Sequence, residues 1–99
     1  MISVNDTLLS DVKNYLDITW EDVESDKKLA GIIKRGISVI NDRCGAEFDY
    51  SKDEMPKELL INYVMYARAN AVDEFLQHYA TELLRLQLIT EVEGYEKAK

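Results

Sequence analysis

The sequence predicts an all-α protein, a small bundle of three main helices with an additional C-terminal helical segment. Apolar residues recur at intervals of three and four, which is the spacing of one helix face, and no stretch alternates as a strand would. A chain of 99 residues, 46% of them hydrophobic, can bury a single core. We therefore expect one helical domain over residues 1–88, followed by a flexible C-terminal tail at 89–99.

The first helix is predicted over residues 7–16. Asp6 or Thr7 is available as its N-cap, because both side chains can accept a hydrogen bond from the first turn. Its apolar residues are Leu8, Leu9, Val12, Tyr15 and Leu16.

The second helix is predicted over residues 25–44, with Ser25 as N-cap and Gly45 as the left-handed residue that ends it. One apolar stripe runs along it: Leu29, Ile32, Ile33, Gly36, Ile37, Ile40 and Cys44. A glycine inside a helix costs about 1 kcal/mol relative to alanine. We therefore expect another helix to approach closely at Gly36.

The third helix is predicted over residues 57–77, with Pro56 at its first position and a further segment at 79–88 that can continue it. Its core stripe consists of Leu60, Val64, Ala67 and Ala71, and we expect Val64, Ala67 or Ala71 to face Gly36. The later apolar residues, Phe75, Tyr79, Leu83 and Leu86, drift around the helix axis. This drift predicts either a bend near residues 73–79 or a far end that leaves the core.

An acidic segment, LDITWEDVESDKK at residues 16–28, precedes the second helix. A calcium loop that began at Asp17 would need glycine where Asp22 stands and glutamate where Lys28 stands. We therefore expect a solvated approach to a helix, where carboxylates are favourable, and no metal site. Trp20 either packs over the junction of the first two helices or anchors another subunit.

The remaining chemistry-bearing residues are isolated. His78 has no second histidine, and Cys44, the only cysteine, fits a buried thiol in a reducing compartment. No glycine-rich phosphate loop, G-x-S-x-G or H-E-x-x-H motif is present. We expect no catalytic residue, metal or cofactor, and thus not an enzyme.

The charge of the chain limits the classes of partner that it is expected to bind. Twelve basic and nineteen acidic residues give a net charge of −7, which opposes casual binding to nucleic acid or an anionic membrane. Two basic pairs, Lys27/Lys28 and Lys34/Arg35, lie one above the other and could grip a phosphate, but their acidic neighbours favour an ordinary solvated face. The start of the chain has no signal-peptide pattern, and no apolar run is long enough to span a bilayer. We expect a soluble, intracellular protein without sequence-specific nucleic-acid binding.

The C-terminal arm, residues 83–99, carries apolar residues that do not continue the core stripe. It either orders against a neighbouring subunit or folds back over Phe48 and Tyr50. The candidate subunit or partner interface consists of Trp20, Tyr50, Leu86, Leu88, Ile89, Val92 and Tyr95.

The order of these segments resembles the head–tail connector, or head-completion adaptor, proteins of long-tailed bacteriophages, especially those of Gram-positive hosts. The resemblance spans roughly residues 7–88. It rests on Lys13-Asn14-Tyr15-Leu16, the acidic segment Asp17 to Asp26, the helix end at Gly45 and the helix start at Pro56.

The resemblance implies a structural protein of the virion, made in the host cytoplasm and placed at the head–tail interface. Such proteins assemble as a ring beneath the portal after DNA packaging, extend the channel, and dock the next connector or tail-completion protein. The subunit could be monomeric in solution before it joins the ring. The alternative is a small acidic phage- or prophage-encoded regulator that binds a host protein.

Overall fold

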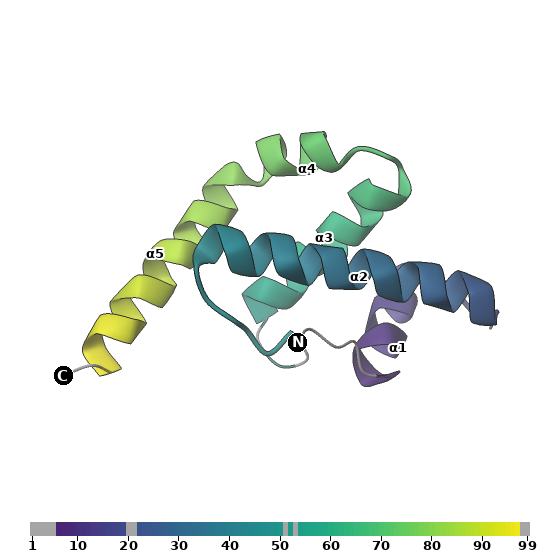
Figure 1. The fold of residues 1–99 in the computed structure, drawn as a ribbon, viewed down its shortest axis with the longest axis horizontal. Coiled ribbons are helices and arrows are strands. Elements are labelled where there is room, and N and C mark those ends of the chain that lie inside the picture. The colour runs from purple at the N-terminus through teal and green to yellow at the C-terminus, as the bar shows by residue number, and fades with distance from the viewer. Residues whose placement is uncertain (1–5, 20–21, 51, 53, 98–99) are drawn as a thin grey trace.

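The computed structural model describes residues 6–19, 22–50, 52 and 54–97, apart from the side chains of residues 6–7 and 93–97. This part of the chain contains five helices and no strand (Figure 1): α1 (Asp6–Tyr15), α2 (Val23–Cys44), α3 (Glu54–Arg68), α4 (Val72–His78) and α5 (Ala80–Lys97). The all-α class is confirmed. A bundle of three main helices is inexact, because the long helix expected after Pro56 is divided into three.

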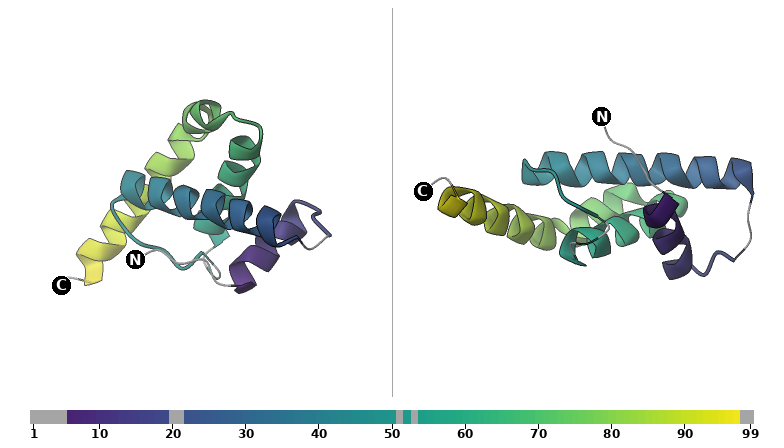
Figure 2. Two further views of the ribbon diagram at one scale, coloured as in Figure 1. Left: turned by 45° about the vertical axis from the view of Figure 1, so that its right-hand side comes forward. Right: turned by 90° about the horizontal axis from the view of Figure 1, so that it is seen from below.

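The core lies where α2 packs against both α3 and α5, with α1 packed against α2. Figure 2 shows α2 crossing the other helices in its left view and lying as a layer above them in its right view. The largest fully buried side chains come from four of the helices: Val12, Ile33, Ile40, Leu60, Val64 and Phe75. Segments distant in the sequence therefore share one apolar interior.

Capping residues define both ends of helix α2. Asp22 is the N-cap, and its side chain accepts a hydrogen bond from the backbone N–H of Glu24 at 3.3 Å. Ser25, the expected N-cap, instead donates from Oγ to Asp22 Oδ2 at 2.8 Å, so the helix begins earlier than predicted. Gly45 ends it in the left-handed conformation, with φ of 65°, as expected.

Gly36 does lie at a close approach, but its neighbours differ from those predicted. A Cβ atom on Gly36 would lie 2.7 Å from Tyr63 Cδ1 and 2.8 Å from Leu60 Cδ1. Of the expected neighbours, Val64, Ala67 and Ala71, none is among the three nearest atoms. Glycine is therefore needed to admit two large side chains of α3.

The break between α3 and α4 corrects the continuous helix predicted at 57–77. Asn70 adopts a left-handed conformation with φ of 56°, and the N–H of Ala71 donates to the carbonyl of Tyr66 at 2.8 Å. Asparagine tolerates this region better than most residues. The short α4 then buries Phe75, which makes an edge contact with Tyr63 at 5.3 Å between ring centroids.

Helix α5 returns to α2 and then runs obliquely toward one end of a molecule that measures 48 × 27 × 22 Å (Figure 1). Leu83 and Leu86 are buried against the body, and the carbonyl of Leu83 accepts a contact from Cys44 Sγ at 3.7 Å. Residues 89–97 continue the same helix, so no change of secondary structure separates the expected tail from the domain.

Candidate functional site

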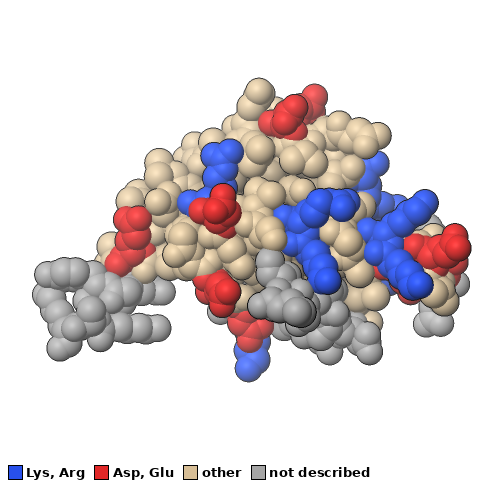
Figure 3. All heavy atoms as spheres, viewed as in Figure 1, with Lys and Arg blue, Asp and Glu red and all other residues tan. Residues whose placement is uncertain are grey.

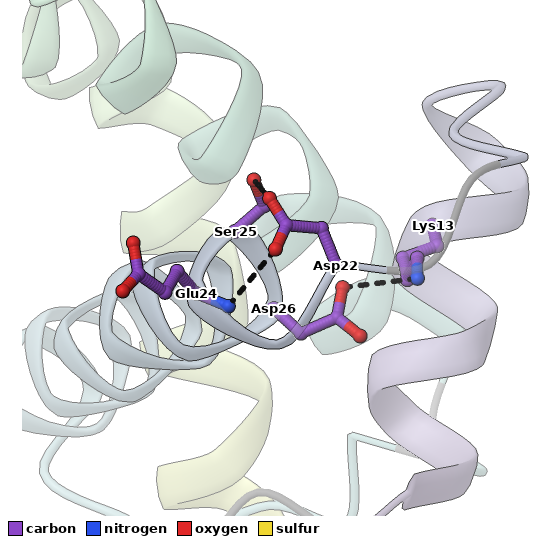
Figure 4. A network of polar contacts seen from close by, with 5 residues as sticks. All are labelled: Lys13, Asp22, Glu24, Ser25 and Asp26. Atoms are coloured by element: carbon purple, nitrogen blue, oxygen red, sulfur yellow. Dashed lines mark hydrogen bonds and ion pairs between the residues drawn. The ribbon is translucent and has the colours of Figure 1, made fainter.

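The acidic segment builds the junction between α1 and α2 (Figure 4). Asp22 caps α2, Glu24 lies in its first turn, and Asp26 pairs with Lys13 Nζ of α1 at 3.0 Å. Each of these carboxylates thus has a structural role, because caps and first-turn acids offset the positive end of the helix.

Asp17, where a calcium loop would have begun, has a structural role. Its φ is 57°, and the next N–H, that of Ile18, donates to the carbonyl of Lys13 at 2.9 Å. Asp17 is therefore the left-handed residue just beyond the end of α1. Within the described residues, no group of three or more His, Cys, Asp or Glu is placed to hold a metal ion.

Cys44 and His78, the two isolated residues with potentially reactive side chains, both make structural contacts. Burial raises the pKa of the Cys44 thiol, which keeps it protonated and weakly nucleophilic near neutral pH. His78 Nδ1 lies 3.1 Å from the Tyr66 hydroxyl, at the edge of an aromatic cluster that includes Phe75 and Tyr79. Neither arrangement supplies a nucleophile with an activating base.

An exposed apolar face on α5 is the strongest candidate for an interaction surface. Leu84, Leu88 and Val92 recur every four residues and are 53%, 52% and 56% exposed. At 100° per residue they lie on the side of the helix opposite Leu83 and Leu86, which are buried. We call Leu84, Leu88 and Val92 the α5 face. The buried stripe of α5 packs against the body of the protein, and the exposed stripe is available to a second partner.

The other residues predicted for this interface have mixed outcomes. Ile89 is 41% exposed beside the α5 face, whereas Leu86 and Tyr50 are buried in the core and are not available at the surface. Tyr50 is held there by donating from its hydroxyl to Asn41 Oδ1 at 2.7 Å. Trp20 lies outside the described residues, and so does the side chain of Tyr95.

A second apolar surface was missed by the sequence interpretation. Tyr15, one of the apolar residues of the first predicted helix, is 66% exposed, and Met65 of α3 is 51% exposed. Both line a surface hollow together with Ile61, and charged side chains including Lys57 and Glu58 surround them. We call this the Tyr15–Met65 hollow. Tyr15 fits the helical spacing of Leu8 and Val12, but it lies in the last turn of α1, where the core no longer covers it.

Comparisons with known proteins identify no relative. No protein family, curated protein or solved structure matches this chain. Among the described residues, no helix has both the length and the apolar character needed to cross a membrane. Any functional assignment therefore depends on the chemistry of these surfaces and on the resemblance of the sequence pattern.

Proposed function

We propose that this protein is a structural subunit of a bacteriophage head–tail connector, which assembles as a ring beneath the portal and docks the next connector or tail protein. The observation that carries the proposal is the presence of two separate apolar surfaces on one small chain. They are the α5 face and the Tyr15–Met65 hollow. The sequence pattern that resembles connector proteins also supports the proposal.

Two different surfaces are what a ring requires. A cyclic assembly with more than two subunits uses heterologous contacts, in which one patch on each subunit meets a different patch on the next. The far end of α5 and helix α1 lie toward opposite ends of the long axis of the molecule (Figure 1). The α5 face of one subunit can therefore reach the Tyr15–Met65 hollow of the next, and the contact can repeat around a ring.

The composition of the two surfaces supports this pairing. Interfaces combine an apolar centre with a polar rim. Leu84 and Leu88 are flanked on α5 by exposed Arg85 and Glu91, and Tyr15 and Met65 are flanked by charged residues of α3. Each surface thus has an apolar centre bordered by charges of both signs.

The alternative, an acidic regulator that binds a host protein, receives less support. A protein that mimics nucleic acid needs carboxylates arrayed over one face. Here Asp22 and Asp26 serve the α1–α2 junction, while the middle of the exposed face of α2 is basic. A regulator that binds one host protein needs one exposed apolar surface, whereas a ring uses two different ones.

The direct test is deletion of the gene from the phage genome that encodes this protein. We expect DNA-filled heads without tails by electron microscopy, and rescue by the wild-type gene supplied in trans. The double variant Leu84→Asp/Leu88→Asp should remain helical by circular dichroism but fail to rescue. Val23→Asp is the matched control, since Val23 is 71% exposed and lies outside both surfaces.

The two parts of the proposal can fail separately. Normal tailed virions after deletion would refute the connector function itself. Rescue by a folded Leu84→Asp/Leu88→Asp variant would leave that function standing but remove the α5 face as the contact between subunits.

A further inference from the structure

The middle of α2 carries four exposed cations whose arrangement neither the fold nor the proposed function explains. Lys27 and Lys28 precede Gly31 by one helical turn, and Lys34 and Arg35 follow it by one turn. Figure 3 shows basic side chains gathered along this face of α2. We call Lys27, Lys28, Lys34 and Arg35 the basic strip.

The basic strip consists of two pairs of cations with open space between the pairs. Seven residues separate Lys27 from Lys34 and Lys28 from Arg35, so the pairs lie about 10 Å apart along the helix at a rise of 1.5 Å per residue. Gly31 lies between the pairs, and a Cβ atom placed on it would meet no heavy atom within 4 Å. An anionic group can therefore approach the helix backbone between the two pairs.

Within the part of the chain that the structure describes, none of these cations forms an ion pair, and exposed Glu24 and Asp42 lie on α2 beyond the two ends of the strip. The ion pairs within the described residues join Lys13 to Asp26 and Lys57 to Asp11, and neither uses a residue of the basic strip. Arg68 at the end of α3 is also exposed and lines the same surface hollow as Lys28. A second helix thus extends the positive surface.

The composition of the strip favours a phosphate backbone over a protein partner. Protein interfaces have an apolar centre that contains most of their binding energy. The only large hydrophobic side chain of α2 that is exposed is Val23, which precedes the strip. Lysine, arginine and serine are the side chains that contact phosphates, and exposed Ser38 continues this face.

The spacing of the strip suits duplex DNA. The major groove is about 12 Å wide, which is close to the separation of the two cation pairs, so each pair can face the phosphates of one edge. The net charge of −7 opposes DNA at long range. Salt limits the reach of that repulsion to about 8 Å at physiological ionic strength, so carboxylates elsewhere on the molecule oppose contacts between the strip and the phosphates only weakly.

We propose that the basic strip of α2 binds the phosphate backbone of duplex DNA without sequence preference. The binding would be electrostatic and strongly dependent on salt. This inference goes beyond the connector function and does not depend on it, because DNA binding by the isolated chain needs neither a ring nor a portal.

The test is fluorescence anisotropy of the full chain with a labelled duplex of random sequence, titrated over a range of sodium chloride concentrations. With four phosphate contacts, the logarithm of the binding constant should fall with the logarithm of salt concentration with a slope of about −3 to −4. The variant Lys34→Gln/Arg35→Gln should bind more weakly, and its slope should be smaller in magnitude by about 2.

The matched control is Arg43→Gln/Lys52→Gln, which removes the same charge from two exposed residues outside the strip. It should bind DNA as the wild type does. No binding at about 50 mM salt, or equal losses in both variants, would overturn the proposal. Poly-glutamate serves as a second probe, and tighter binding to it than to DNA would indicate an acidic protein partner and would also overturn the proposal.

Discussion

Replacing Gly36 with alanine should destabilise the protein relative to the same change at Gly31. Both glycines lie inside α2, so both substitutions gain the helix propensity of alanine, worth about 1 kcal/mol. Only at Gly36 does the new methyl group meet other atoms, those of Tyr63 and Leu60 at 2.7 and 2.8 Å. The difference between the two variants therefore isolates the packing cost at the helix crossing.

The structure sets the size of that difference. Leu60 is fully buried, and the ring of Tyr63 is held by its edge contact with Phe75, so neither can move away freely. Overpacking of this kind costs about 1–3 kcal/mol. Gly31→Ala should be stabilising by about 1 kcal/mol, whereas Gly36→Ala should be neutral or destabilising by up to about 2 kcal/mol. Gly36→Leu adds a larger side chain at the same crossing and should cost more than Gly36→Ala.

Urea denaturation followed by circular dichroism measures both free energies of unfolding, and thermal melts provide a check. For a domain of this size, 1 kcal/mol corresponds to about 4–8 °C, so the two alanine variants should be clearly separated. If Gly36→Ala stabilises the protein as much as Gly31→Ala does, Gly36 does not lie at a tight contact and the crossing described above is wrong.

Three further outcomes are expected. Calcium, magnesium or zinc should leave the melting temperature unchanged, since a ligand of the folded state must raise it; a rise of several degrees would contradict the structural role of the acidic segment. Deleting residues 88–99 should lower the melting temperature by only about 2 °C, because Leu83 and Leu86 remain in the core; a large fall would show that the arm stabilises the monomer. Burial, reinforced by nearby Cys44, raises the pKa of Tyr50, so the folded state should be at full stability below pH ~10 and lose it as pH rises further. Tyr50→Phe should cost about 0.5–1.5 kcal/mol at pH 8 because its hydrogen bond is lost. Between pH 8 and pH 11 this variant should lose less stability than the wild type. Equal losses would refute the assignment of the pH effect to Tyr50.

Patterns of spacing and helix ends predicted much of the fold. The stripe of α2 is long and regular, and Gly45 is the residue type that a left-handed helix end favours, so both predictions are confirmed. Asp22 and Ser25 are equally good caps by residue type, so residue type alone does not decide between them. The break at Asn70 was missed because no glycine or proline marks it, although the drift of the later apolar residues did indicate a change of direction.

The surfaces were harder to predict, because periodicity shows which residues share a helix face but not what covers that face. Leu88 and Val92 were separated correctly from the core stripe, whereas Leu86 lies within the core. Tyr15 matched the spacing of the other apolar residues of its helix but lies at the surface. The neighbours of Gly36 depend on the angle at which α2 crosses α3, and no pattern in a single helix specifies that angle.

Only the first turns of helix α5 are packed against the body of the protein, and the rest of the helix projects from it. Leu83 and Leu86 hold its first turns against the body, and residues 88–97 extend about 15 Å beyond them at 1.5 Å per residue. A tilt of about 10° at the fixed end moves the tip of such a helix by roughly 2–3 Å. Small changes in core packing around Leu83 can therefore alter the direction of the α5 face far more than they alter the body, so the tilt of one helix would set the curvature of any assembly built through it.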